Sequence, residues 1–393
     1  MKQLPDENRI SYFARTNFRN KGNKFGIKKG DRKSHIYTIG KTSTGKSTFL
    51  ANLMNSDLQN GEGFCLIDPH GDLALKILRM IPEKRKSDVI LFNPGQSDHS
   101  ISLNILQVSS NEDKYQIASS FISILKKIYG DSWGPRLEYT LRNTLLTILE
   151  FPEMGTLLWI PKLLTNQAFR TEIVSNIHDE YLRVFWVDEF MKYTPRFRQE
   201  VISPILNKIG QFLSNPNIRR IFQKPRSNFN FREIMDNGKI LIANLSKGKI
   251  GEDNAALLGA MLVSKIESAA YSRQNIPEEK RRSFYLYADE FQSYTTSSFA
   301  SILSEARKFN LSLILAHQHL HQLDPLTRGA IFGNVGTIIS FRVGAEDAEY
   351  LAEEFYPKFN KGDFLDLPNY HMYLRMMING EISKGFSAKV LNI

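Results

Sequence analysis

The octapeptide Gly40-Lys41-Thr42-Ser43-Thr44-Gly45-Lys46-Ser47 matches the pattern G-x-x-x-x-G-K-[ST]. It follows an apolar run at 35–39 that is typical of a buried strand, and it precedes an amphipathic helix expected over 47–58. Two glycines let the backbone curl so that successive N–H groups point inward, where they and the helix N-terminus bind phosphate oxygens. The sequence therefore predicts a strand, a phosphate-binding loop and a helix, in that order.

The side chains of this loop indicate ATP with Mg²⁺ as the ligand. We expect Lys46 to reach the β- and γ-phosphates and Ser47 to place its hydroxyl on Mg²⁺. A simple glycine-rich turn is the alternative, and the strand and helix that flank the loop argue against it. The residues expected to bind the nucleotide are Gly40, Lys41, Thr42, Ser43, Thr44, Gly45, Lys46, Ser47 and Thr48.

Such a site needs carboxylates, and an apolar strand ending in a pair of acids supplies them. In Tyr285-Leu286-Tyr287-Ala288-Asp289-Glu290 we expect Asp289 to hold Mg²⁺ and Glu290 to act as the base that activates water. Asp188-Glu189 also follows apolar residues, but Arg183 interrupts the would-be strand. We therefore interpret that second pair as solvated acids on an amphipathic helix.

Three further polar residues are candidates for catalysis. Gln318 follows an apolar strand at 311–316, so it lies at the sheet edge where ligands bind, and we expect it to orient water or to sense the γ-phosphate. Arg307 is either an ordinary surface residue or an arginine inserted into a neighbouring subunit's phosphate site. Arg342, after the apolar run at 338–341, is the second candidate for that role.

Hydrophobic periodicity divides the chain into an α/β part and a helical part. Short apolar runs alternate with helical patterns up to about residue 106 and again from residue 239, which is typical of a mostly parallel sheet. We predict a basic arm at 1–24, an α/β nucleotide-binding domain at 25–108 and 230–393, and an all-helical insertion at 109–229. Asn379-Gly380 predicts a tight turn and a C-terminal β-hairpin.

Composition favours a globular, unexported protein with an acidic partner. The 393 residues are 42% hydrophobic and carry 51 Lys and Arg against 41 Asp and Glu, and ten of those cations lie in residues 1–40 against three acids. That basic leader fits a contact with a phosphate backbone, a contact with an acidic membrane surface, or a solvated flexible arm. Cys65 is alone, so no disulfide or cysteine-based metal site forms, and no run is long enough for a transmembrane helix. We expect a cytoplasmic protein, with any inner-membrane association made through a partner.

Taken together, the motifs resemble those of the FtsK/HerA superfamily of ring ATPases, most closely the coupling proteins of type IV secretion and conjugation. The resemblance extends over roughly residues 25–386, and the helical insertion falls where coupling proteins carry their all-α domain. The segments that carry it are Gly40–Ser47, Leu66-Ile67-Asp68-Pro69-His70-Gly71-Asp72-Leu73, Ala288-Asp289-Glu290-Phe291, Arg307 and Leu315-Ala316-His317-Gln318-His319-Leu320-His321-Gln322-Leu323.

This resemblance implies a RecA-like core in a hexamer, with ATP between subunits and DNA in a central channel. It assigns Arg307 the trans-acting role and Gln318 the sensor role. Two departures stand out. Ser43 stands where many relatives have glycine, and serine is tolerated there if its φ is negative. The transmembrane helices usual in conjugative coupling proteins are not found in this sequence.

The leading hypothesis is an ATP-driven, hexameric DNA translocase acting in conjugation, type IV secretion or mobile-element transfer. One alternative is a HerA-like motor for DNA processing, phage defence or genome packaging. Another, of a different class, is a nucleotide-switched adaptor that recruits a partner without moving DNA. The substrate can be single- or double-stranded DNA. The partner can be a relaxase, a nuclease or a component of a secretion system.

Overall fold

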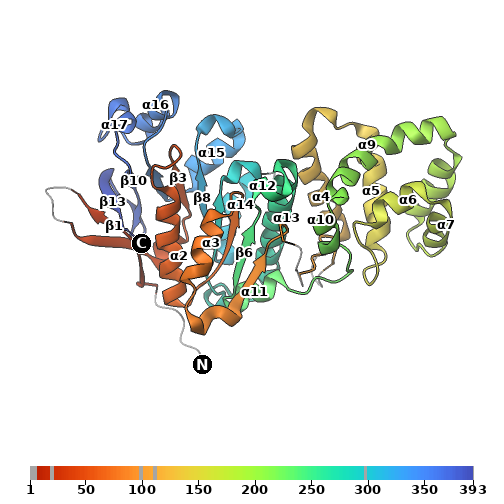
Figure 1. Ribbon diagram of the computed structural model, residues 1–393, viewed down its shortest axis with the longest axis horizontal. Helices are drawn as coiled ribbons and strands as arrows, with labels where there is room; N and C mark the ends of the chain where they lie inside the picture. The colour runs from red at the N-terminus through yellow and green to blue at the C-terminus, as the bar shows by residue number, and fades with distance from the viewer. Residues whose placement is uncertain (1–6, 18–21, 97–100, 109–112, 296–298, 393) are drawn as a thin grey trace. The chain divides into compact units, whose positions relative to one another are not determined.

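The structure is a computed structural model that describes residues 7–17, 22–96, 101–108, 113–295 and 299–392 (Figure 1). The chain forms two compact units. The α/β unit comprises Met1–Phe92, Phe231–Ser246 and Ala269–Ile393, and the helical unit comprises Asn93–Asn230 and Lys247–Ser268.

One large sheet is the centre of the α/β unit. Among the described residues it has eleven strands. The seven adjacent strands from β9 to β5 in the spatial order run parallel to one another. In spatial order the strands are β2 (Lys24–Lys28), β1 (Ile10–Thr16), β13 (Phe386–Val390), β10 (His371–Arg375), β9 (Thr337–Ser340), β3 (Ile36–Ile39), β8 (Leu311–His317), β7 (Phe284–Asp289), β4 (Gly63–Asp68), β6 (Ile240–Asn244) and β5 (Val89–Phe92).

Helices cover this sheet because its central strands are apolar along their whole length. Every residue of β3, β4, β6, β7 and β8 is buried, as expected for parallel strands covered on both faces. The predicted α/β fold with a mostly parallel sheet is therefore confirmed. The helices and helical turns of this unit include α1 (Lys29–Arg32), α2 (Lys46–Asn60), α3 (Asp72–Met80), α11 (Phe231–Asn237), η8 (Phe291–Ser293), α14 (Phe299–Glu305), η9 (Ala306–Phe309), α15 (Pro325–Asn334), α16 (Ala345–Glu354) and α17 (Lys361–Leu365).

The C-terminal hairpin forms where the sequence predicts it. Strands β11 (Met377–Ile378) and β12 (Glu381–Ile382) pair antiparallel across Asn379-Gly380. Both turn residues have positive φ, +53° and +85°, which is the geometry of the favoured two-residue hairpin turn.

The N-terminal region does not form the separate basic arm that we expected for 1–24. Strand β1 pairs with β13 and β2 as an internal strand of the sheet, and Phe13 and Ala14 are buried in the main core. Strict alternation is missing from β1, because its register against β2 shifts between Tyr12 and Ala14 and both Phe13 and Ala14 are buried. Residues 1–6 and 18–21 lie outside the described residues.

Part of the basic leader is used inside the fold. Lys29 Nζ lies 2.6 Å from the carboxylate of Glu62, and Arg32 forms a two-pronged contact with Asp57. Arg32 also donates to the hydroxyl of Tyr287 at 2.7 Å. Since these two cations are buried in ion pairs, they are not available to bind DNA phosphates.

The helical unit begins earlier in the chain than we expected. Residues 101–108 belong to it, because Asn104 donates to the carbonyl oxygens of Gly155 at 2.8 Å and Pro225 at 2.7 Å. Its helices include α4 (Lys114–Tyr129), α5 (Pro135–Leu149), α6 (Trp159–Thr165), α7 (Gln167–Ser175), α8 (Glu180–Val184), α9 (Pro195–Ser214), α10 (Pro216–Ile221), α12 (Lys247–Ile250) and most of α13 (Glu252–Tyr271). In the part of the chain that the structure describes, no helix is long and apolar enough to cross a membrane.

Candidate nucleotide site

Parallel strand order gathers the predicted site residues at one edge of the sheet. Strand β8 lies between β3, which leads into the phosphate loop, and β7, which ends at Asp289. Carboxyl ends of neighbouring parallel strands are where open α/β sheets bind ligands. A pocket of about 250 Å³ occupies this edge, lined by Thr42, Ser43, Gly45, Lys46, Ser47, Thr48, His70, Asp289, Glu290, Gln318 and Tyr370.

The glycines of the loop stand where side chains do not fit. A Cβ on Gly40 would lie 2.6 Å from the Cβ of Phe341, and Gly45 has φ of +126°. Ser43 does not meet the condition under which serine would be tolerated there, because its φ is positive, at +63°. A non-glycine residue in this left-handed region costs roughly 1–2 kcal/mol of backbone free energy. The loop is therefore strained at Ser43, and a glycine at this position would relieve the strain.

Lys46 is a buried cation whose ammonium is held by the loop itself. Its Nζ donates to the carbonyl oxygens of Gly40 and, at 3.1 Å, of Lys41. Burial lowers the pKa of Lys46, and the charges of Asp289 and Glu290 act in the opposite direction. Both acceptors are neutral, so the ammonium can exchange them for phosphate oxygens of a polyanion at little cost.

Two carboxylates, Asp289 and Glu290, act on this lysine, and a third, Asp68, acts on Asp289. Burial, together with the negative charges of Glu290 and Asp68, raises the pKa of Asp289 to about 7, although the charge of Lys46 acts in the opposite direction. The excess of negative charge in a buried site favours a bound cation. A carboxylate and the hydroxyl of Ser47, both hard oxygen ligands, suit Mg²⁺, so the donor set fits that ion.

Glu290 is fixed from two sides by amide groups. Gln318 Nε2 donates to one carboxylate oxygen at 2.8 Å, and Gln292 Nε2 donates to the other at 2.8 Å. The hydroxyl of Thr42 in turn donates to Gln318 Oε1 at 2.9 Å. Glu290 also has φ of +49°, a strained conformation of the kind that clusters at functional sites. A chain of hydrogen bonds thus connects the phosphate loop with the carboxylate.

The two candidate arginines have different positions. Arg342 binds its own chain: its guanidinium donates to Asn369 Oδ1 at 2.9 Å, and its carbonyl accepts from the Lys41 N–H at 2.8 Å. Arg307 is exposed and does not line the pocket of its own subunit. Arg307 is thus exposed, whereas Arg342 is half-buried.

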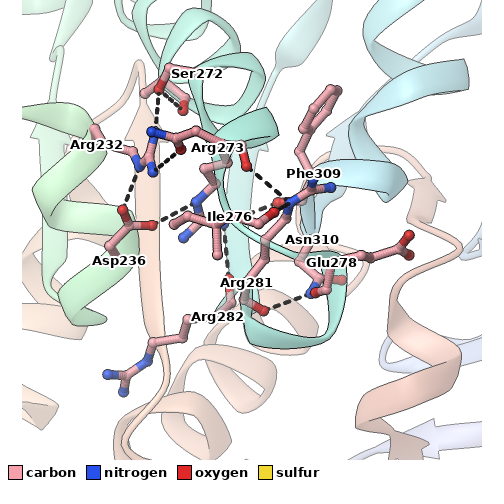
Figure 2. A network of polar contacts seen from close by, with 12 residues as sticks. Arg232, Asp236, Ser272, Arg273, Ile276, Glu278, Arg281, Arg282, Phe309 and Asn310 are labelled. Atoms are coloured by element: carbon pink, nitrogen blue, oxygen red, sulfur yellow. Dashed lines mark hydrogen bonds and ion pairs between the residues drawn. The ribbon is translucent and has the colours of Figure 1, made fainter.

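The turn η9, which carries Arg307, is anchored by two buried or half-buried arginines (Figure 2). Arg273 donates to the carbonyl oxygen of Phe309 at 3.0 Å, and Arg281 donates to that of Lys308. Arg273 is fully buried and paired with Asp236 at 2.9 Å, and burial lowers its pKa to about 10. The backbone beside Arg307 is therefore held rigidly.

Comparison with known proteins identifies the family. The family described as the type IV secretion-system coupling protein DNA-binding domain matches residues 23–355. The chain belongs to that family. A curated coupling-protein relative, the type 4 coupling protein DotL of Legionella pneumophila, is 22% identical over 368 residues, which cover 79% of this chain. The match spans about half of DotL, 47% of its length.

Solved structures show the fold of the coupling-protein family in this chain. The bacterial conjugative coupling protein TrwB lacking its N-terminal segment, in complex with sulphate, has a TM-score of 0.69 at 16% identity and covers 98% of this chain and 94% of its own. TrwB in complex with ADP and Mg²⁺ matches with a TM-score of 0.69 at 15% identity, over 98% and 95% of the two chains. VirB4 of Thermoanaerobacter pseudethanolicus matches with a TM-score of 0.63 at 11% identity, over 98% of this chain and 97% of its own. The RecA-like core predicted from the sequence is thereby confirmed.

In this coupling-protein chain the second acidic pair is not among the residues that line the pocket. Asp188 pairs with Lys192 at 2.8 Å, and Glu189 accepts from the hydroxyl of Tyr139 at 3.0 Å. Both acids lie in a helical turn of the helical unit.

Two pocket residues escaped the sequence analysis. His70 lines the pocket and belongs to the quoted Asp-Pro-His-Gly-Asp segment, so its place after a strand was the available signal. Tyr370 precedes strand β10, and nothing in its local sequence points to a ligand.

Proposed function

We propose that the chain is an ATP-driven DNA translocase of the coupling-protein class that works as a hexamer. The observation that carries the proposal is the pocket in which Lys46 and Ser47 of the phosphate loop face Asp289, Glu290 and Gln318. Binding alone needs the loop, whereas the paired carboxylates and the hydrogen-bonded amide are parts that hydrolysis needs.

Each side chain has a defined task in ATP hydrolysis. Lys46 binds the β- and γ-phosphates in place of its two loop carbonyls, and Glu290 accepts a proton from the attacking water. Gln318 orients that water, since its amide is already bonded to Glu290. Mg²⁺ held by Ser47 and Asp289 would neutralise phosphate charge. A well-placed base of this kind contributes roughly 10²–10⁴ in rate.

The exposed Arg307 completes the site in a neighbouring subunit. A guanidinium supplied in trans stabilises the charge of the transferring phosphoryl group and is worth roughly 10³–10⁵ in rate. A head-to-tail ring is the symmetry that gives every site such a partner. The anchored turn η9 fits this role, because the backbone that directly follows Arg307 is fixed before the subunits meet.

DNA is the proposed cargo because the family is that of a DNA-binding domain and the chain has a formal charge of +10. A cationic surface binds the phosphate backbone, with an affinity that falls steeply as salt rises. We further propose that the protein works in the cytoplasm and meets the inner membrane through a secretion-system or relaxase partner.

Subunit mixing tests the ring and the trans-acting arginine together. Glu290→Gln and Arg307→Ala subunits are each inactive alone, but a 1:1 mixture recovers about a quarter of the wild-type hydrolysis, because about one interface in four then pairs an intact Glu290 with an intact Arg307. Mixing Glu290→Gln with Lys46→Ala is the control and restores nothing, since both residues act from the same subunit. An Arg307→Ala protein with full activity would contradict the assignment.

Movement along DNA is tested by displacement of a third strand. Wild-type protein and ATP should release a triplex-forming oligonucleotide from linear duplex DNA, whereas the Glu290→Gln variant should not. Hydrolysis that DNA stimulates without any release of the third strand would reject translocation on duplex DNA and leave single strands as the track.

A further inference from the structure

Tyr370 lines the candidate nucleotide pocket but has no part in the hydrolytic roles described above. It directly precedes β10 and has φ of +65°. A bulky side chain in the left-handed region is uncommon and costs backbone free energy. Strain of this kind persists where the surroundings fix the residue, and it points to a task for the side chain.

The backbone of Tyr370 is fixed from three directions. Its N–H donates to the carbonyl oxygen of Thr44 in the phosphate loop at 2.7 Å, and its own carbonyl accepts from the N–H of Val390 at 2.9 Å. The preceding residue, Asn369, accepts from Arg342 at 2.9 Å. These contacts tie the segment before β10 to the loop, so the ring is presented to the pocket from a rigid support.

The ring lies beside the residue that begins helix α2. A Cβ placed on Gly45 would be 3.2 Å from the Cα of Tyr370 and 3.3 Å from its ring atom Cδ1. The side chain is nevertheless 43% exposed, so one face remains free. An aromatic face that is exposed inside a polar pocket is a ready surface for another flat ring.

The pocket has two distinguishable ends. Glu290, Gln318 and Thr42 are joined by hydrogen bonds and mark the end where the γ-phosphate reacts. Tyr370 lies against Gly45, at the end of the loop that leads into helix α2. A triphosphate with its γ-phosphate at Glu290 extends its α-phosphate and nucleoside away from that carboxylate.

We propose that the phenol ring of Tyr370 stacks on the nucleobase of the bound nucleotide. The inference rests on the proposed function, since it assumes that the loop holds a nucleoside triphosphate. Stacking uses the flat face of the ring and not its hydroxyl, so phenylalanine should replace tyrosine without loss. Loss of one base-stacking aromatic typically weakens binding roughly 5- to 150-fold.

Equilibrium binding of MgADP and of magnesium pyrophosphate to the full chain, measured by calorimetry, tests this proposal. We expect Tyr370→Ala to weaken MgADP binding about 10-fold and to leave pyrophosphate binding unchanged, because pyrophosphate has no base. Tyr370→Phe should bind both probes like the wild type. Tyr356→Ala is the matched control, since Tyr356 is 83% exposed and does not line this pocket.

Two results would overturn the proposal while leaving nucleotide binding intact. Equal MgADP affinity in Tyr370→Ala and wild type would show that the ring makes no contact with the base. An equal loss for MgADP and pyrophosphate would show that the ring only supports the loop. A wild-type chain that binds neither probe would instead overturn the proposed function, and this inference with it.

Discussion

Strand β3 is preceded by a histidine whose protonation should destabilise the α/β unit. His35 is buried, and its Nδ1 accepts a hydrogen bond from the Leu313 N–H at 3.1 Å. Its Nε2 lies 3.1 Å from the carbonyl oxygen of Leu303 and must donate to it. Only the neutral ring satisfies both partners, because a second ring proton would face the Leu313 N–H. Burial, with a smaller contribution from the charge of Arg307, lowers the pKa of His35 to about 4.

The direction and size of the pH effect follow from this pKa. The folded-state value of about 4 lies below the value of about 6.5 expected in the unfolded chain. The unfolded state therefore binds more protons, and stability that is fully present above pH 6.5 is lost as the pH falls towards 4. The total loss is about 3 kcal/mol, of which about 2 kcal/mol is already gone at pH 5.

Replacement by asparagine isolates this contribution. His35 has φ of +61°, which asparagine tolerates better than most residues, and asparagine does not titrate. Urea unfolding of wild type and His35→Asn at pH 7.5 and pH 5.0 should show that the stability difference between them shrinks by about 2 kcal/mol at the lower pH. Far-UV circular dichroism is the suitable signal, because Trp133, Trp159 and Trp186 all lie in the helical unit. A stability difference that is the same at both pH values would refute the neutral-ring assignment.

Four further substitutions test other parts of the structure. Lys46→Ala should weaken MgADP binding roughly 10- to 100-fold by calorimetry, because a charge-assisted contact with phosphate is lost, and unchanged affinity would refute that contact. Arg32→Met leaves Asp57 buried without its cation, so the free energy of unfolding should fall by about 3–5 kcal/mol in urea; a loss below about 1 kcal/mol, the size of a surface pair, would show that the pair is solvated. Gly45→Ala, at φ of +126°, should destabilise the fold and weaken nucleotide binding, whereas Gly210→Ala, which meets nothing within 4 Å in α9, should stabilise it by about 0.5–1 kcal/mol. Effects of the same sign at both glycines would contradict the strain argument.

Local sequence was enough to predict the parts of the site that depend on strand ends. The phosphate loop, Asp289 and Gln318 each follow an apolar run, and parallel strands bring such ends to one edge. These residues could therefore be assigned to one site without knowing which strands pair with which. Their chemical roles stay predictions, to be tested by the variants above.

Features that depend on distant partners could not be predicted in this way. Lys29 and Arg32 look like part of a basic arm until Glu62 and Asp57 are placed beside them. Tyr370 reaches the phosphate loop because β10, the strand that follows it, pairs antiparallel with β9. In each case the deciding contact joins segments that no local pattern relates.

Steady-state ATP hydrolysis with and without DNA is the most direct test of the central claim. The purified full chain should hydrolyse ATP slowly alone and much faster with linear double- or single-stranded DNA, and the preferred strand form identifies the track. Glu290→Gln should lose roughly 10²–10⁴ of that rate while still binding MgADP. Hydrolysis that is indifferent to both forms of DNA would contradict the DNA motor and favour a nucleotide-switched adaptor.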